Sequence, residues 1–215
     1  MKIILLGPSG SGKGTLARFI CKDFGIPHIS TGDLFRENIA KKTPLGILVE
    51  ENITGGLWIS DDITMRMLME RLGSEDARCG FILDGVPRTM TQAWLLDSNV
   101  KVDLVIELNV ADDIVMDRLT GRFVCTRCNK NHNTKLGAVD KCRSCGGSLY
   151  QREDDTEEAI RFRLKQFRAS LRDIKKFYKE KGTLFSVDVA EDDLPAEVYG
   201  RVREYFNENN IFPTC

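Results

Sequence analysis

GPSGSGKGT, residues 7–15, is the stretch of this chain that decides the fold. It directly follows the apolar run Lys2–Leu6, and a helical pattern begins near Lys13. In such a turn the glycines let backbone N–H groups face phosphate oxygens, the helix N-terminus adds positive potential, and the lysine supplies a charge. A plain strand-to-helix turn is the alternative, but Gly-Lys at this spacing favours a P-loop that binds a nucleoside triphosphate. The predicted contacts are Gly10, Ser11, Gly12, Lys13, Gly14 and Thr15.

The residue after the lysine departs from the usual P-loop pattern. Ser or Thr ordinarily stands there and coordinates Mg²⁺, whereas this chain has Gly14, with Thr15 one position later. Because Mg²⁺ gives up its waters reluctantly, we expect it to be held mainly by waters and phosphate oxygens. Asp84 ends the apolar run Phe81–Leu83 and is predicted to orient those waters, since α/β ligands lie beyond the carboxyl ends of strands. A turn or cap role is the alternative for Asp84.

Short β-like runs alternate with helical patterns along the chain. After Lys2–Leu6 the runs are Pro27–Ile29, Phe81–Leu83, Leu104–Leu108 and Leu184–Val187. This alternation is typical of parallel α/β proteins. We therefore predict a P-loop NTPase-type fold, with a parallel five-stranded sheet and helices on both faces.

Two segments interrupt this alternation. Residues 30–59 contain two short helical patterns with no strand between them, which indicates a helical insertion. Residues 122–155 are rich in cysteine, glycine and lysine and lack apolar periodicity, so they need something other than a hydrophobic core. We predict one core domain, formed by residues 1–29, 60–121 and 156–215, that carries both insertions.

Four of the seven cysteines have the spacing of metal ligands. The pairs Cys125-x-x-Cys128 and Cys142-x-x-Cys145 are separated by 13 residues. Such paired knuckles predict a tetrahedral tetrathiolate site, for which Zn²⁺ is the usual ion and which keeps no open position for substrate. Iron or cobalt in place of zinc remains an alternative for the bound ion. Two disulfides would also fit the spacing, but disulfides are rare in cytosolic proteins. His132 could replace one of the cysteines, although its spacing favours a position at the surface or beside a ligand.

The charge balance limits the possible partners. The 215 residues carry 31 Lys and Arg against 32 Asp and Glu, a formal charge of -1, so we expect neither nucleic acid nor membrane as a partner. The apolar run Ile3–Leu6 is much shorter than a signal-peptide core, and no stretch reaches membrane-spanning length. We predict a cytoplasmic monomer, in which the remaining cysteines are unpaired thiols: Cys21, Cys79 and Cys215.

The chain resembles the adenylate kinase family, in its long form with a zinc-binding lid, over essentially its whole length. The resemblance rests on the loop at residues 7–15, on STGD at 30–33 with Arg36, and on DGVPRT at 84–89 with Gln92. It implies a reversible, Mg²⁺-dependent transfer of the γ-phosphoryl group of ATP to AMP, giving two ADP. It also implies that residues 30–59 bind the monophosphate and that residues 122–155 form a lid that closes and excludes water.

The same resemblance assigns a second nucleotide site. Arginines hold a phosphate through forked hydrogen bonds, while an amide and a hydroxyl read polar edges of a base. Thr89-x-x-Gln92 is also a capping box, so a structural role for Gln92 stays open. The family usually has an aromatic residue where this chain has Val86 and an aliphatic residue where it has Trp58. A reshaped AMP pocket would make the preference for AMP less strict. The implied AMP contacts are Thr31, Arg36, Arg88 and Gln92, with Gly85 and the backbone of Leu57, Trp58 and Ile59 closing over the base.

Arginines are the residues expected to perform the chemistry. Transfer between two anions needs alignment and charge neutralisation and no covalent nucleophile. Arg118 and Arg122 lie four residues apart on one predicted helical face, before the cysteine segment. The resemblance assigns these two to ATP, and assigns Arg152 and Arg163 to AMP. The implied catalytic set is Lys13, Arg88, Arg122, Arg152 and Arg163.

Some alternatives stay open at this point. The family commonly has a glycine and a polar residue against the ATP base where this chain has Val189-Ala190, so those contacts are unassigned. A kinase for GMP or UMP would share the other features. A GTP-dependent switch is disfavoured, because residues 133–136, which resemble part of a guanine-reading element, lack its aspartate and lie inside the cysteine segment. A nucleic-acid-binding zinc ribbon is disfavoured by the absence of aromatic stacking residues between the knuckles.

Overall fold

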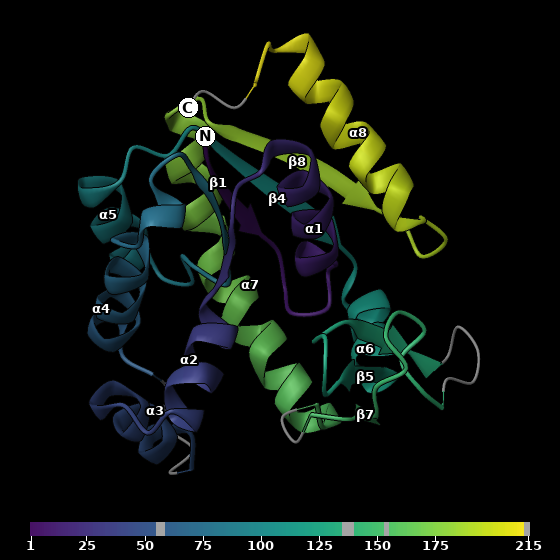
Figure 1. The fold of residues 1–215 in the computed structure, drawn as a ribbon. Helices are drawn as coiled ribbons and strands as arrows, with labels where there is room; N and C mark the ends of the chain where they lie inside the picture. The colour runs from purple at the N-terminus through teal and green to yellow at the C-terminus, as the bar shows by residue number, and fades with distance from the viewer. Residues whose placement is uncertain (55–58, 135–139, 153–154, 213–215) are drawn as a thin grey trace.

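A parallel five-stranded sheet, in the order β2-β3-β1-β4-β8, forms the centre of the molecule (Figure 1). The computed structural model describes residues 1–54, 59–134, 140–152 and 155–212. Leu5 on the central strand is in register with Asp84 on one side and with Ile106 on the other. The predicted fold class is confirmed. The strands are β1 Lys2–Leu6, β2 His28–Ser30, β3 Phe81–Asp84, β4 Leu104–Val110 and β8 Leu184–Val189.

Two strands run further than their apolar runs indicated. β4 continues to Val110 and β8 to Val189, and the polar residues Asn109 and Asp188 pair across them with a side-chain hydrogen bond of 2.7 Å. Strand ends are set by pairing with a neighbouring strand, so the apolar pattern underestimated both.

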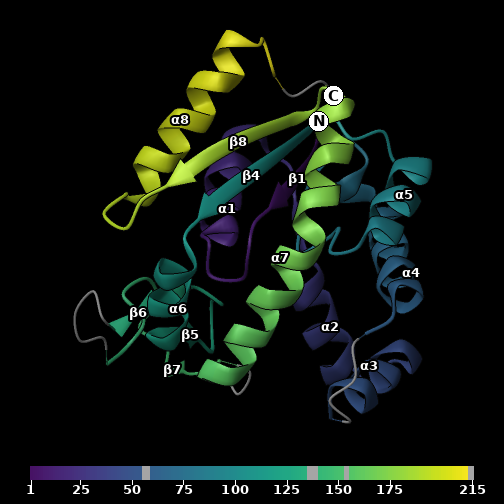
Figure 2. The same ribbon diagram turned by 180° about the vertical axis from the view of Figure 1, so that it is seen from behind.

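Alternating side chains of the sheet enter two separate cores, because successive strand residues point to opposite faces. Ile3 and Leu5 pack with α1 (Lys13–Phe24) and α8 (Pro195–Glu208). Ile4 and Leu6 pack with α4 (Asp61–Leu72), α5 (Met90–Asn99) and the second half of α7 (Glu157–Glu180). Figures 1 and 2, which view the sheet from opposite sides, show α1 and α8 covering one face and α7 the other.

The helical segment after β2 consists of α2 (Thr31–Ala40) and α3 (Pro44–Thr54). The two helices are very close at Gly46, where a Cβ would lie 2.1 Å from the carbonyl oxygen of Asn38. Ser30 caps α2 by accepting from the N–H of Asp33 at 3.3 Å, and Ser60 caps α4 in the same way. The chain therefore leaves the sheet and returns to it through capped helices. The short helix η1 (Glu75–Ala77) then leads to β3.

The second interruption contains a small antiparallel sheet, in the order β6-β5-β7, between α6 (Asp112–Thr120) and α7. Its strands are β5 (Arg122–Cys125), β6 (Asn131–Asn133) and β7 (Leu149–Tyr150). Figures 1 and 2 place this sheet across the molecule from α3, with the first turns of α7 between them. Few side chains are buried within it, so apolar burial alone is a weak source of stability there.

The cysteines outside the knuckles correct one prediction. Cys79 is disulfide-bonded and is not an unpaired thiol. Cys21 is a half-buried free thiol on α1, and Cys215 lies outside the described residues. Disulfides depend on proximity in space, which sequence spacing does not give for distant residues.

Across residues 1–54, 59–134, 140–152 and 155–212, no helix has both the length and the apolar character needed to cross a bilayer.

Candidate active site

The P-loop links β1 to α1, and its conformation depends on glycine. Gly10 and Gly12 have φ values of 86° and 102°, in the left-handed region that side chains with a Cβ avoid. Gly12 is the N-cap of α1, and no side chain of the described residues caps this helix start. The N–H groups of the first turn are therefore available to an anion.

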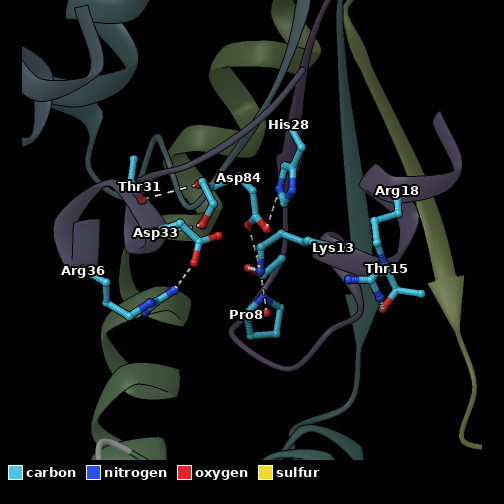
Figure 3. A network of polar contacts seen from close by, with 11 residues as sticks. Pro8, Lys13, Thr15, Arg18, His28, Thr31, Asp33, Arg36 and Asp84 are labelled. Carbon is cyan, nitrogen blue, oxygen red and sulfur yellow. Dashed lines mark hydrogen bonds and ion pairs between the residues drawn. The ribbon is translucent and has the colours of Figure 1, made fainter. Parts of the chain in front are cut away.

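Lys13, Asp84 and His28 meet at the carboxyl edge of the sheet (Figure 3). Lys13 Nζ donates to the carbonyl oxygens of Gly7 at 2.9 Å and Pro8 at 2.8 Å, and lies 3.7 Å from Asp84 Oδ1. His28 Nε2 lies 3.3 Å from the other carboxylate oxygen of Asp84. The ammonium group is thus held at the loop, close to the carboxylate, before any phosphate arrives.

Burial and neighbouring charges shift the pKa values of this pair. Burial by itself raises the pKa of Asp84, but Lys13 and His28 outweigh it and hold that pKa below its usual range. Burial is the largest cause that lowers the pKa of Lys13, and the positive Arg88 and Arg122 act in the same direction, while Asp84 opposes them. The positive charges of Lys13, Arg88 and Arg122 thus lie close enough to affect one another, which suits an anionic ligand.

The hydroxyl groups of the loop face away from Asp84 or are buried. Thr15 Oγ1 accepts from Arg18 at 3.2 Å, and Figure 3 shows this pair apart from Asp84 and His28. The position nearest Asp84 is Gly14, where a Cβ would lie 3.8 Å from Oδ2 and where there is no hydroxyl. The buried Ser11 hydroxyl has no hydrogen-bond partner among the described residues, so it is free to bond a phosphate oxygen.

Thr31, Gly85 and Arg88 lie together beside Asp84. Thr31 Oγ1 donates to the Asp84 carbonyl oxygen at 3.4 Å, and Arg88 Nε donates to the Gly85 carbonyl oxygen at 2.8 Å. Gly85 has φ of 87°, and a Cβ there would lie 2.5 Å from Thr31 Oγ1, so only glycine fits. Burial lowers the pKa of Arg88, yet a guanidinium stays charged in proteins. Arg36 lies further along α2, ion-paired to Asp33.

Gln92 is 2% exposed, and both ends of its amide are engaged. Oε1 accepts from the Arg88 backbone N–H at 2.7 Å, and Nε2 donates to Asp61 Oδ1 at 2.7 Å. Thr89 caps α5 by accepting from the Gln92 N–H at 3.1 Å, and its hydroxyl donates to Asp61 Oδ2 at 2.7 Å. The side chain of Gln92 bonds the N–H of Arg88 and not that of Thr89, so this is half of the predicted capping box.

Asp155 joins two of the predicted catalytic arginines, one at the start of the lid and one on α7. Arg122, at the start of β5, makes two hydrogen bonds with its carboxylate, of 2.7 and 2.6 Å, and Arg163 on α7 makes one of 3.1 Å. The Asp155 side chain is 0% exposed. Arg152 is tied to the same turn, because its carbonyl oxygen accepts from the Asp155 N–H at 3.1 Å. One buried carboxylate therefore binds the guanidinium group of Arg122 at the start of the segment and that of Arg163 on the helix that follows it.

Arg118 on α6 lies between the P-loop and the end of β8. Its Nη1 is 3.5 Å from the carbonyl oxygen of Ser11, and its Nη2 donates to the carbonyl oxygen of Ala190 at 3.3 Å. The loop after Val189, whose nucleotide contacts the sequence left open, is thus brought next to the P-loop.

The four knuckle cysteines converge on one point. Their sulfur atoms lie within 4.8 Å of one another, and all four are free thiols. The closest pairs are Cys125 with Cys145 at 3.4 Å and Cys128 with Cys142 at 3.5 Å. A tetrahedral ion with Zn–S bonds of about 2.3 Å places its sulfurs about 3.8 Å apart, so the cluster fits a tetrathiolate metal site.

Donors around the cluster favour thiolate over thiol. The backbone N–H groups of Arg127 and Ser144 point to Cys125 and Cys142 sulfur, each at 3.4 Å. His132 Nε2 lies 3.3 Å from Cys142 sulfur, beside a ligand and not in its place. Such contacts orient ligands and tune a metal site.

One cavity of about 1360 Å³ unites most of the predicted residues. It extends from the P-loop past Asp84–Thr89 to the lid strands and the loop after Val189. Thr31 and Gln92 do not line it, and Leu57 and Trp58 lie outside the described residues. The cationic residues along its wall include Lys13, Arg36, Arg88, Arg118, Arg122, Arg152 and Arg163.

Three polar residues of this site were not predicted from the sequence. Asp155 ends the segment that begins at Arg152, and that motif was the available signal. Asp61 is the first residue of α4, where an acidic residue is expected simply to favour the helix dipole. His28 lies in a short strand, and nothing in its sequence neighbourhood indicated the contact with Asp84.

Comparisons with known proteins give a consistent result. The sequence model of the family described as "Adenylate kinase" matches residues 5–183. The chain is 41% identical over 196 residues to an adenylate kinase of Clostridium kluyveri, covering 87% of this chain and 90% of that protein. It is 40% identical over 213 residues to an adenylate kinase of Symbiobacterium thermophilum, covering 94% of this chain and 99% of that protein. An adenylate kinase of Clostridium beijerinckii is 41% identical, with 87% and 91% covered.

Proposed function

This chain belongs to the adenylate kinase family, and we propose on that premise that it transfers the γ-phosphoryl group of ATP to AMP, reversibly, giving two ADP. The observation that carries the proposal is the single cavity that holds Lys13 of the P-loop together with Arg36, Arg88 and Arg163 from other elements. A site with a triphosphate loop and further arginines suits two anionic nucleotides. Residues 30–59 as the monophosphate-binding insertion, a cytoplasmic location and a monomeric state stay predictions.

The donor nucleotide is assigned to the P-loop. The open N–H groups of the first turn of α1, the Ser11 hydroxyl and Lys13 would hold the phosphates of ATP. Arg118 lies over the loop through its contacts with Ser11 and Ala190, which favours a position beside the base or the ribose. The loop that follows Val189 supplies the other wall of that region.

The acceptor nucleotide is assigned to the other side of Asp84. Arg36 and Arg88 would hold the phosphate of AMP. Thr31 and Gln92, which lie behind the cavity wall and are hydrogen-bonded to its residues Asp84 and Arg88, would read its base. Arg36 is exposed, and among the described residues its guanidinium is ion-paired with Asp33, so it can exchange that carboxylate for phosphate. Arg88 is fixed by Gly85 at one nitrogen and keeps its other donors for a ligand.

Catalysis on this scheme is alignment and charge neutralisation, with no covalent intermediate. Lys13 neutralises charge on the donor, while Arg88, Arg122, Arg152 and Arg163 surround the group in transfer. Mg²⁺ supplies further neutralisation of the phosphates when bound, and Asp84 would hold it through water, since Gly14 offers no hydroxyl nearby. Closure of the lid, residues 122–155, would bring Arg122 and Arg152 inward and exclude water as a competing acceptor.

The cysteine cluster is assigned to a structural Zn²⁺. Four sulfurs and nearby N–H donors suit this ion, and no ligand position remains for substrate. Zinc would supply the cohesion that a segment with so few buried apolar side chains lacks.

Replacing one ligand tests this assignment. In Cys142→Ser we expect the zinc content to fall from about one ion per chain to well below that, and the melting temperature to drop, with part of the activity retained. Metal analysis and thermal unfolding measure these changes. Cys21→Ser, which alters a half-buried thiol on α1 outside the cluster, should leave the zinc content unchanged. Retention of full metal by Cys142→Ser would refute the tetrathiolate assignment.

Acceptor specificity tests the reaction itself. With ATP as donor and AMP, GMP, UMP or CMP as acceptor, we expect AMP to give the highest kcat/KM, because the site beside Asp84 follows the family motif apart from Val86. Coupled detection of ADP measures the rates. Turnover with no monophosphate would overturn the kinase assignment, and a preference for GMP or UMP would overturn the choice of AMP alone.

A further inference from the structure

A buried hydrogen-bond network fixes the side-chain amide of Gln92 from both sides. Its Oε1 accepts from the backbone N–H of Arg88, and its Nε2 donates to Asp61 Oδ1, each at 2.7 Å. Thr89 holds the carboxylate in turn, because its hydroxyl donates to Asp61 Oδ2 at 2.7 Å. Asp61 is the first residue of α4, and Thr89 caps α5, so rigid elements carry both partners.

This network permits only one orientation of the amide. A backbone N–H can only donate, and an ionised carboxylate can only accept. Rotating the amide by half a turn would place NH₂ against the Arg88 N–H and oxygen against the Asp61 carboxylate. Both contacts would be repulsive and both buried groups would lose a partner, which is costly in a side chain that is 2% exposed. The assignment of oxygen and nitrogen thus follows from chemistry.

An amide with a fixed orientation discriminates between bases, whereas a rotating amide does not. The edge of adenine offers a 6-amino donor beside the N1 acceptor, while hypoxanthine and guanine offer a 6-oxo acceptor beside an N1–H donor. A freely rotating amide can match either order by turning over. Within the described part of the chain each atom of the Gln92 amide has one hydrogen-bond partner, which leaves one lone pair on Oε1 and one N–H on Nε2 for a base. These two groups match only one order.

We propose that Asp61 is a positioning residue that fixes the Gln92 amide and thereby selects a 6-amino over a 6-oxo purine in the acceptor nucleotide. The inference rests on the proposed function, because it takes Gln92 as the reader of the acceptor base. It assigns Asp61 no contact with substrate. The preference for a 6-amino purine would then come from a carboxylate that does not touch the base. A 6-oxo purine would require the Gln92 amide to turn over, which would leave its buried hydrogen-bonding groups without partners.

The test compares AMP with inosine monophosphate, which differs only in carrying the 6-oxo edge. In Asp61→Asn, a neutral amide replaces the acceptor-only carboxylate and can turn to accommodate Gln92 in either orientation. We expect the ratio of kcat/KM for AMP to that for inosine monophosphate to fall about tenfold, with a higher KM for AMP and an unchanged KM for ATP.

Asp62→Asn is the matched control. Asp62 is the next residue of the same helix turn, so the variant loses the same charge near the same helix N-terminus, but its carboxylate is exposed and pairs with Arg66. Its selectivity ratio should equal that of the wild type. Asp61→Glu keeps an acceptor-only group and should retain more of the selectivity than Asp61→Asn. In a Gln92→Ala background, Asp61→Asn should change the ratio no further.

The outcomes separate this inference from the proposed function. If the wild type uses no AMP, the proposed function fails. If the wild type prefers AMP and a folded Asp61→Asn keeps the wild-type ratio, the positioning role of Asp61 fails while the proposed function stands. A change of ratio that is the same with and without Gln92 would also overturn the inference, because Asp61 would then act by another route.

Discussion

Replacing Lys13 by methionine is expected to lower kcat by about 100- to 1000-fold, the usual effect of losing one preorganised group that stabilises charge in the transition state. Methionine keeps a flexible apolar stem in a position that is 8% exposed, so the loop can retain its packing. The Lys13 ammonium lies against the carbonyl oxygens of Gly7 and Pro8 and 3.7 Å from Asp84, at the point where the P-loop opens into the cavity. Steady-state kinetics with ATP and AMP measure the loss.

A second readout of the same variant follows from the pKa of Asp84. Its folded-state pKa is depressed, so the carboxylate contributes stability above its unfolded pKa, and that contribution is lost as the pH falls through the folded value. Lys13 is the largest cause of the lowering, so Lys13→Met should shrink the contribution and raise the pH at which acid unfolding begins. Acid titration of unfolding measures this shift.

Lys41→Met serves as the control for charge removal. Lys41 is exposed and pairs with Glu37 one helix turn away, and such exposed pairs contribute little to stability. Its kcat and acid unfolding should match the wild type. A kcat within about threefold of the wild type for a folded Lys13→Met would contradict the proposed role of Lys13.

Replacing Asp155 by alanine is expected to destabilise the protein by about 3–5 kcal/mol, because it removes a fully buried carboxylate that binds two mostly buried guanidinium groups. Arg122 and Arg163 share this side chain, which is 0% exposed, through three hydrogen bonds of 2.6 to 3.1 Å. Their loss of alignment should also lower kcat well below the wild-type value at temperatures where the variant is folded. Thermal unfolding and kinetics at a temperature below the transition measure the two effects separately.

Asp112→Ala is the matched control for Asp155→Ala. Asp112 also pairs with an arginine, Arg168, at 2.7 Å, but its side chain is 54% exposed, so the expected loss of stability is about 0–1 kcal/mol. Asp155→Asn keeps the shape and can still accept hydrogen bonds, so its effect should lie between the two. If Asp155→Ala and Asp112→Ala lowered the free energy of unfolding equally, the buried network around Asp155 would contribute no more to stability than an exposed ion pair.

The residues that the sequence identified are those whose chemistry is contained within a few neighbouring positions. The P-loop presents its own N–H groups, so residues 7–15 were sufficient to predict both the turn and its anion. Each cysteine pair supplies two of the four sulfur atoms of a tetrahedral site, and the two pairs lie together as their spacing indicated. The alternation of apolar runs and helical patterns likewise gave the parallel sheet, because side-chain periodicity follows directly from local backbone geometry.

Local sequence patterns did not predict how far β4 and β8 extend, and they did not predict the disulfide at Cys79. Both features depend on which other segment lies next to them in space, and a short run of residues does not identify that segment. Gln92 shows the intermediate case. Its capping relation to Thr89 lies within three residues and was visible, while its bond to Asp61 spans 31 positions and was not.

The sequence by itself therefore determined which groups this protein has available: a phosphate loop, a carboxylate at a strand end, a set of arginines and a tetrathiolate cluster. Only the tertiary structure decided which carboxylate holds which cation or amide. Asp155 with Arg122 and Asp84 with His28 are 33 and 56 residues apart in the chain. The physical reason is that a charged side chain acts over a few ångströms in any direction. Its partners are therefore set by the packing of the sheet and helices, and its neighbours along the chain do not identify them.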